Sequence, residues 1–164
     1  MGDVEIRPPR PEEYAAAGEV TVQAYDVDGH LADDVGYDAK LRDVASRAEL
    51  AEVLVAVDAA GEVLGTVTVV RPGSPYAEIS RPGELEFRML AVAPSARGRG
   101  VGEALTRAVL DRARALGVPK VVLSSLDRMH SAHRLYERLG FARLVERDWR
   151  PFPHISLIAY QIDV

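Results

Sequence analysis

The feature of this sequence that most constrains its fold is a glycine-rich turn between an apolar run and an amphipathic helix. The apolar run, residues 85–92, is predicted to be a strand that stops before Pro94, because a residue that precedes a proline is restricted to extended backbone. The turn, residues 97–102, reads Arg-Gly-Arg-Gly-Val-Gly. After it, apolar positions recur at helical spacing until Gly117, a typical helix C-terminus. The chain therefore predicts a strand–turn–helix unit at its centre.

This turn has the chemistry of a phosphate site. The glycines at 98, 100 and 102 let the backbone approach a ligand closely. The first N–H groups of the following helix have no internal acceptor, and the helix dipole favours an anion there. Arg97 and Arg99 add charge-assisted hydrogen bonds. The turn is thus suited to a diphosphate or triphosphate group.

Three phosphate-binding motifs can be compared with the turn. A P-loop needs Gly-x-x-x-x-Gly-Lys-Ser/Thr, and the turn has no lysine. A dinucleotide fingerprint needs Gly-x-Gly-x-x-Gly, and Glu103 stands where its third glycine belongs. The spacing that fits is Arg/Gln-x-x-Gly-x-Gly/Ala, met by Arg97, Gly100 and Gly102.

The rest of the chain predicts an α+β fold, with one domain over residues 1–164. Residues 71–83 hold three prolines and two glycines, which predicts a loop rather than a linker. Prolines at 8, 9 and 11 end any strand that begins at Val4. Apolar spacing predicts helices near 12–25, 41–48 and 132–139, and strands near 53–57, 63–70, 121–123, 141–145 and 155–162.

Composition excludes several classes of function. The sequence has no cysteine, so it forms no disulfide, thiolate metal site or acyl-cysteine intermediate. Its four histidines show no paired metal-ligand spacing, and we expect no metal. The net charge of -5 argues against nucleic-acid binding and permits a cationic ligand. With no signal peptide and no membrane-spanning run, we expect a cytoplasmic protein that does not bind a membrane.

Two segments that flank the turn give it a family context. Residues 85–94 read Leu-Glu-Phe-Arg-Met-Leu-Ala-Val-Ala-Pro, and residues 132–141 carry Ala-x-x-Leu-Tyr-Glu-x-x-Gly-Phe. With the turn between them, they resemble the GCN5-related N-acetyltransferase (GNAT) superfamily, in which this turn binds the pyrophosphate of acetyl-CoA. The resemblance implies a mixed, mostly antiparallel sheet flanked by helices. In the family, the central strand of this sheet is bulged and splays from its neighbour, and the pantetheine arm of the cofactor fills the gap.

The resemblance also implies the cofactor site. Backbone groups of the central strand would pair with the pantetheine arm, and one N–H would polarise the thioester carbonyl. The family often has an asparagine at the position of Met129, where it contacts the pantetheine or phosphate arm of the cofactor. The Met129 side chain cannot make that polar contact, so Arg128 or Ser131 would substitute. The implied cofactor-binding residues are Leu90, Ala91, Val92, Arg97, Gly98, Arg99, Gly100, Val101, Gly102 and Ser131.

Two catalytic residues follow from the same resemblance. Tyr136 would stabilise the leaving thiolate; full proton transfer from a tyrosine near pKa 10 to a thiolate near 8.5 is uphill by about 2 kcal/mol, which favours a hydrogen bond. Glu86 would be the base, although a carboxylate near pKa 4.3 is mismatched with an ammonium near 10.4 by about 6 units. Alternatively, Tyr136 is a core aromatic, and Glu86 pairs with Arg88 while Glu84 serves as the base.

The resemblance leaves the acceptor open. We expect transfer of an acetyl group to a primary amine, small or peptidic, by direct attack in a ternary complex. The alternatives are a non-catalytic acyl-CoA sensor or a larger acyl donor, and the oligomeric state, for instance a homodimer, is also open.

Two groups of residues could form the acceptor site. An acidic run near the first helices suits a cationic amine or is only a solvated loop. An aromatic group before the last strand would line the pocket or pack its edge. These residues are Asp26, Asp28, Asp33, Asp34 and Asp38 with Tyr25 and Tyr37, and Trp149, Phe152 and His154.

Overall fold

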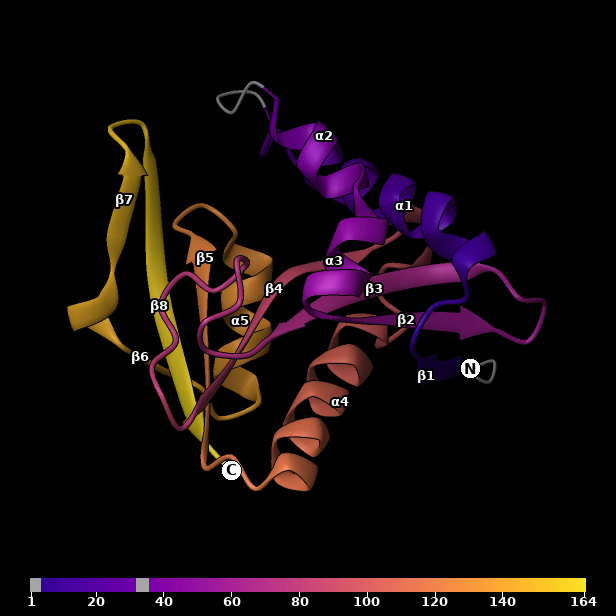
Figure 1. Cartoon of the computed structure of the whole chain (residues 1–164). Coiled ribbons are helices and arrows are strands. Elements are labelled where there is room, and N and C mark those ends of the chain that lie inside the picture. The colour runs from indigo at the N-terminus through magenta and orange to yellow at the C-terminus, as the bar shows by residue number, and fades with distance from the viewer. Residues whose placement is uncertain (1–3, 32–35) are drawn as a thin grey trace.

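The computed structural model describes residues 4–31 and 36–164. In this part of the chain, an eight-stranded sheet has the order β1-β2-β3-β4-β5-β8-β6, with β7 paired to β8 (Figure 1). The strands are β1 Val4–Arg7, β2 Glu52–Asp58, β3 Val63–Val70, β4 Glu84–Val92, β5 Lys120–Leu126, β6 Ala142–Arg143, β7 Trp149–Phe152 and β8 Ile155–Asp163. The helices are α1 Tyr14–Val27, α2 Tyr37–Arg42, α3 Val44–Leu50, α4 Val101–Leu116 and α5 His130–Arg138, with 3-10 turns at Pro11–Glu13, Pro94–Ala96 and Val145–Arg147.

Only β4 and β5 pair in parallel; the other strand pairs among the described residues are antiparallel. The predicted mixed, mostly antiparallel sheet is therefore confirmed, as is the strand–turn–helix unit, in which α4 ends at Leu116 before Gly117 in left-handed backbone. The predicted hairpin also forms, because β2 and β3 pair antiparallel around a turn that contains Gly61.

Three element boundaries differ from the predictions. The second helix is divided into α2 and α3 at Asp43. The backbone of Asp43 is not helical, and its side chain accepts a hydrogen bond from the Ser46 N–H at the start of α3. The strand predicted at 141–145 keeps only two residues before a 3-10 turn begins at Val145. Strand β7 was not predicted, because it contains Pro151. A proline is tolerated there because β7 lies at an edge, where among the described residues it pairs only with β8.

The core lies on both faces of β3, all eight of whose residues are buried. Helices α1 and α4 both contact β3, and in Figure 1 they lie on opposite sides of it. Helix α4 comes especially close at Gly65. A Cβ there would lie 2.9 Å from the carbonyl oxygen of Ala91 and 2.9 Å from Cγ1 of Val101. The absence of a side chain at this position therefore fixes the start of α4 against β3 and β4.

Strands β4 and β5 pair over a short length and then separate. Their parallel register covers Glu84–Glu86 only, while β4 continues to Val92 and β5 continues to Leu126. Within β4, Met89 adopts a φ of 57°, which is unusual for a residue with a side chain, and the β3–β4 register shifts between Thr66 and Thr68. This bulge bends β4 away from β5, as Figure 1 shows. The splay implied by the family resemblance is thus present.

Helices α1 and α2 are held together at a glycine. A Cβ at Gly18 would lie 2.7 Å from the carbonyl oxygen of Arg42, which is backbone and has little freedom to move. The two helices contact each other along α1, and both contribute residues to the cavity described below.

We predict that Gly18→Ala lowers the free energy of unfolding by about 1–3 kcal/mol, since the overpacking cost exceeds the gain in helix propensity. Gly102→Ala is the matched control, because it is also helical but its Cβ would meet its nearest neighbours at 3.5 Å and 3.6 Å. That variant should be neutral or more stable by up to about 1 kcal/mol. Urea unfolding of both variants measures the difference, and equal stabilities would contradict the close-packing argument.

Candidate functional site

A cavity of about 620 Å³ occupies the splay between β4 and β5. One wall comes from β4 and the other from β5, which separate beyond Glu86. Helices α1, α2 and α5, the 71–83 loop and the β7–β8 hairpin complete it. Its lining includes Tyr25, His30, Tyr37, Lys40, Tyr76, Glu78, Phe87, Arg88, Met89, Leu90, Leu123, Ser124, Ser125, Leu126, Arg128, Met129, Ala132, Tyr136 and Phe152.

The predicted cofactor strand residues lie beside this cavity. Leu90 lines it, Val92 is partly buried, and Ala91 is buried against the core. On its other edge β4 is paired with β3, through Ala91 opposite Thr66 and Val92 opposite Gly65. Because the β5 register ends at Glu86, the β5-facing backbone groups of this stretch have no strand partner. They can therefore accept an extended ligand as a further strand.

The glycine turn connects β4 to α4 at the far end of this stretch. Gly98 and Gly100 have φ of 78° and 77°, a region that favours glycine, and Gly100 precedes the first helical residue, Val101. No side chain caps the helix N-terminus. Gly102 lies near both Val92 and Leu135, so the turn, β4 and α5 meet here. The uncapped N–H groups leave an anion site.

The two arginines of the turn differ in their surroundings. Arg97 forms an ion pair with Asp28 just after α1, with Nη2 2.8 Å and Nη1 3.2 Å from the two carboxylate oxygens. This hydrogen bonding lowers the pKa of Asp28. For Arg99, the described part of the chain offers no hydrogen bond or ion pair, and its side chain is partly buried. Arg99 is thus available to an anion, whereas Arg97 must first leave Asp28.

Tyr136 lies on α5 with its side chain in the cavity wall. Its ring packs against Phe87, Phe141 and Tyr160, with ring centres 5.7 to 5.8 Å apart. Burial raises the pKa of Tyr136 well above its usual value, so the hydroxyl stays protonated. Among the described residues it makes no hydrogen bond, which leaves it able to donate one into the cavity. Tyr136 is thus a core aromatic that also lines the cavity, and its catalytic role stays a prediction.

The start of α5 shows which residue near Met129 is placed to contact a ligand. Met129 and Arg128 line the cavity, whereas Ser131 is exposed and accepts a hydrogen bond from Arg134 at 3.1 Å. The Met129 sulfur accepts a hydrogen bond from Ser125, at 3.7 Å. Arg128 is therefore better placed than Ser131 to contact a ligand in this cavity.

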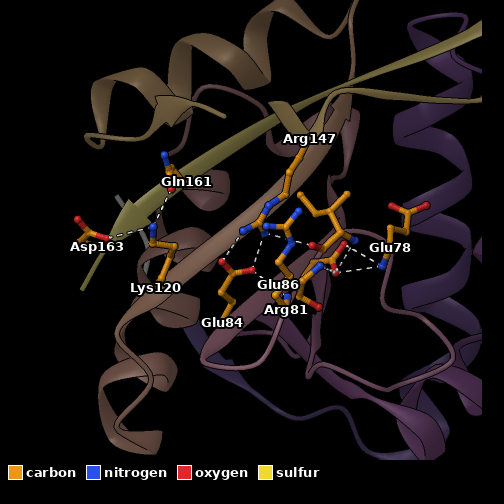
Figure 2. A network of polar contacts seen from close by, with 10 residues as sticks. Glu78, Arg81, Glu84, Glu86, Lys120, Arg147, Gln161 and Asp163 are labelled. Atoms are coloured by element: carbon orange, nitrogen blue, oxygen red, sulfur yellow. Dashed lines mark hydrogen bonds and ion pairs between the residues drawn. The ribbon is translucent and has the colours of Figure 1, made fainter. Parts of the chain in front are cut away.

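Glu86 is not oriented toward the cavity. Its side chain is fully buried, and its carboxylate accepts hydrogen bonds from three consecutive backbone N–H groups of the 71–83 loop (Figure 2). The distances are 3.0 Å to Glu78, 3.3 Å to Ile79 and 3.1 Å to Ser80. The predicted ion pair with Arg88 is wrong, because the loop N–H groups occupy the Glu86 carboxylate and Arg88 binds Glu78.

Glu84, the alternative base, is also engaged in holding this loop. Its two oxygens lie 2.6 Å and 2.8 Å from the guanidinium of Arg147, and one also accepts from the Arg81 N–H at 2.8 Å (Figure 2). Arg147 donates in addition to the carbonyl oxygen of Ile79 at 3.2 Å. Glu84 and Glu86 thus anchor the loop from two neighbouring positions of the same face of β4.

Of the carboxylates on or beside β4, the one that lines the cavity belongs to Glu78, which the sequence interpretation missed. Glu78 pairs with Arg88 at 3.1 Å and accepts a hydrogen bond from Ser124 at 3.1 Å. Arg88 also donates to the carbonyl oxygen of Tyr76 and to the hydroxyl of Tyr37. Burial raises the pKa of Glu78, and Arg88 offsets only part of that effect.

The described members of the acidic run, Asp26, Asp28 and Asp38, do not line the cavity. Asp28 pairs with Arg97, Asp38 pairs with Arg42, and Asp26 is exposed. Asp33 and Asp34 lie outside the described residues. Tyr25 and Tyr37 from the same region do line it, and so does Phe152, whereas His154 stacks on Phe152 with ring centres 5.9 Å apart. This part of the cavity is therefore rich in aromatic side chains, with Glu78 and Asp43 as its acids and Lys40, Arg88 and Arg128 as its basic groups.

In residues 4–31 and 36–164, we find no group of three or more His, Asp or Glu side chains arranged to hold a metal ion. The same ranges contain no helix with the length and apolar character needed to cross a membrane.

Comparison with known proteins identifies the family. The model of the acetyltransferase (GNAT) family matches residues 20–141, well over half of the chain. The protein belongs to this family. Mycothiol acetyltransferase of Salinispora tropica is 43% identical over 99 residues, which are 58% of this chain and 30% of that protein. The chain spans less than two thirds of the length of the curated relatives that it matches first.

Solved structures show the same fold. A GNAT-family acetyltransferase from Staphylococcus aureus superposes with a TM-score of 0.77 at 15% identity, covering 98% of this chain and 99% of that one. A putative acetyltransferase from Salmonella typhimurium, solved with acetyl-CoA, superposes with a TM-score of 0.67 at 22% identity, covering 98% and 93%. The predicted family and fold are thereby confirmed.

We predict that Glu84→Gln lowers the free energy of unfolding at pH 7 by about 2 kcal/mol, because Arg147 loses its buried counter-charge. Burial alone would raise the pKa of Glu84, but the hydrogen bonds from Arg147 and Arg81 bring it below its usual value. Its contribution is therefore present above the unfolded pKa and is lost as pH falls through the folded pKa. The gap between wild type and variant should shrink below about pH 4.

Urea unfolding at several pH values measures that gap. Asp111→Asn, which removes an exposed pair with Arg114, is the control and should change stability by less than about 1 kcal/mol. A gap for Glu84→Gln that stays constant with pH would contradict the ion-pair argument.

Proposed function

We propose that this chain is an acetyl-CoA-dependent N-acetyltransferase, acting as one domain, that moves an acetyl group to a primary amine by direct attack in a ternary complex. The observation that carries the proposal is the splay between β4 and β5, which opens a cavity at one end and leads to an uncapped, glycine-rich helix N-terminus at the other. This combination suits a long ligand with an anionic end and a reactive end. Family membership supports it.

The cofactor would lie along the unpaired edge of β4. The pyrophosphate would accept hydrogen bonds from the N–H groups of residues 98–102 and from Arg99, with Arg97 joining once it is released from Asp28. The pantetheine arm would pair with the backbone of Leu90–Val92. The thioester would then reach the cavity beside Tyr136.

The transfer itself needs few protein groups. The neutral amine attacks the thioester carbonyl, the C–N bond forms, and a β4 N–H stabilises the negative charge that develops on oxygen. The C–S bond then breaks, and the thiolate takes one of the two protons of the amine nitrogen, which keeps the other as the amide N–H. Tyr136 donates a hydrogen bond to the sulfur as its charge develops, since burial keeps the phenol neutral. This direct transfer needs no acyl-enzyme intermediate, which agrees with the absence of cysteine from the chain.

Following free thiol in a mixture of protein, acetyl-CoA and an amine panel tests the function. We expect thiol release that depends on the amine, with the acetylated amine recovered in equal amount. Release that is independent of amine would mean hydrolysis only, and tight acetyl-CoA binding without release under any amine would indicate a sensor; either result contradicts the proposal. Propionyl-CoA and succinyl-CoA in the same assay identify the preferred donor.

We predict that Tyr136→Phe lowers kcat by about 10²-fold while leaving the Kd for acetyl-CoA unchanged, because the hydroxyl acts only as charge develops on sulfur. Tyr160→Phe is the matched control. Its ring packs against Tyr136, but its hydroxyl donates to Glu137 and it does not line the cavity. Steady-state rates and acetyl-CoA titrations compare the two, and an undiminished kcat for Tyr136→Phe would remove the proposed role.

A further inference from the structure

The 71–83 loop brings one carboxylate, that of Glu78, to the wall of the cavity between β4 and β5. We propose that Glu78 is the group that accepts a proton from the acceptor ammonium, and that Glu86 is a positioning residue that holds the loop carrying Glu78. This inference rests on the proposed N-acetyltransferase function. It moves the predicted role of base from Glu86 to a residue that the family resemblance did not indicate.

The geometry of Glu78 leaves one oxygen available. Oε1 interacts with Nε of Arg88 and with the Ser124 hydroxyl, each at 3.1 Å. Oε2 accepts no hydrogen bond from any described residue, and the Glu78 side chain lines the cavity, which a ligand can enter. About a fifth of the side chain is exposed, at 19%. The carboxylate is therefore held in place through one oxygen while the other can receive a proton.

Glu86 is already fully engaged. Three consecutive N–H groups, of Glu78, Ile79 and Ser80, donate to its carboxylate, and the side chain has no exposed surface. A buried carboxylate is expensive unless it is compensated, and these N–H groups supply the compensation. Since one of them belongs to Glu78 itself, the Glu86 carboxylate fixes the backbone from which the Glu78 side chain projects (Figure 2).

The surroundings of Glu78 reduce the mismatch between an ordinary carboxylate and an ammonium. Burial raises the pKa of Glu78, Arg88 opposes this, and Glu86 adds to it. The groups facing it are Arg88 and Glu86 from β4, Ser124 from β5 and Tyr25 from α1, with Tyr37 of α2 bound to Arg88. A cationic amine beside Arg88 also loses its proton more readily, because like charges disfavour the charged form.

The proton balance is complete with the reactants already named. The ammonium gives one proton to Oε2 of Glu78, directly or through a water molecule, and becomes a neutral amine. After C–N bond formation and C–S bond cleavage, a second proton passes from the amine nitrogen to the thiolate. Glu78 then returns its proton to solvent, so that the products are an amide, a thiol and one released proton.

The test uses Glu78→Gln with acetyl-CoA and whichever alkyl amine of the panel gives the fastest thiol release in wild type. We expect kcat/KM for that amine to fall by about 10²-fold or more, with the Kd for acetyl-CoA unchanged. The acidic limb of the pH–rate profile, where Glu78 loses its proton in wild type, should move toward the ionisation of the amine itself. Glu78→Asp should retain the original limb.

An acceptor that needs no base gives an independent readout. With an amine whose pKa lies below 7, the loss caused by Glu78→Gln should shrink to less than about tenfold, because the amine enters already neutral. A loss of the same size for both amines would mean that Glu78 acts structurally, and it would overturn the proposal.

Glu86→Gln separates positioning from proton transfer. It should lower kcat/KM while the acidic limb persists, since Glu78 still titrates, and the limb should move to lower pH because the Glu86 charge no longer raises the pKa of Glu78. Glu49→Gln, on the exposed surface of α3, is the control and should match wild type. A limb that disappears in Glu86→Gln and persists in Glu78→Gln would assign the base to Glu86 and overturn the proposal.

The proposal and the function fail in different ways. If wild type releases no thiol with any amine, the N-acetyltransferase function itself is wrong. If wild type turns over and Glu78→Gln turns over equally fast across the pH range, only the assignment of Glu78 is wrong.

Discussion

The parallel pairing of β4 with β5 extends over only Glu84–Glu86, and the site depends on where it stops. Up to Glu86, the two strands share backbone hydrogen bonds and β4 carries the carboxylates that hold the 71–83 loop. Beyond Glu86, the bulge at Met89 turns β4 away and its backbone edge has no strand partner on that side. One strand thus serves as a structural element in its first half and, in the proposed function, as the surface that binds the pantetheine arm in its second.

Much of this arrangement could be predicted from local sequence. The positions of β3, β4 and α4 follow from apolar periodicity and from the glycines and prolines that end each element, because these are local backbone preferences. The prediction of a phosphate site at residues 97–102 rests on the same local features. The splay itself came from the family resemblance, since the conformation of Met89 depends on contacts that its sequence neighbours do not reveal.

The role of each carboxylate could not be predicted in the same way. Glu84, Glu86 and Glu78 are all acidic residues in or beside β4, and nothing local distinguishes them. The difference lies in partners distant in the sequence: Arg147 for Glu84, the loop N–H groups for Glu86, and the Ser124 hydroxyl for Glu78. Prolines and glycines predict that residues 71–83 form a loop. That this loop folds back over β4 depends on its contacts with Glu84, Glu86 and Arg147, which local sequence does not reveal.

The ion pair between Arg97 and Asp28 also connects the glycine turn to the C-terminal end of α1. A phosphate bound at the turn would compete with Asp28 for the same guanidinium. Asp28 follows the C-terminus of α1, where a negative charge is unfavourable unless it is neutralised. The stability of that helix end and the affinity for the phosphate are therefore reciprocally coupled. Because Tyr25, near the same end of α1, lines the cavity, this helix end borders both the glycine turn and the cavity.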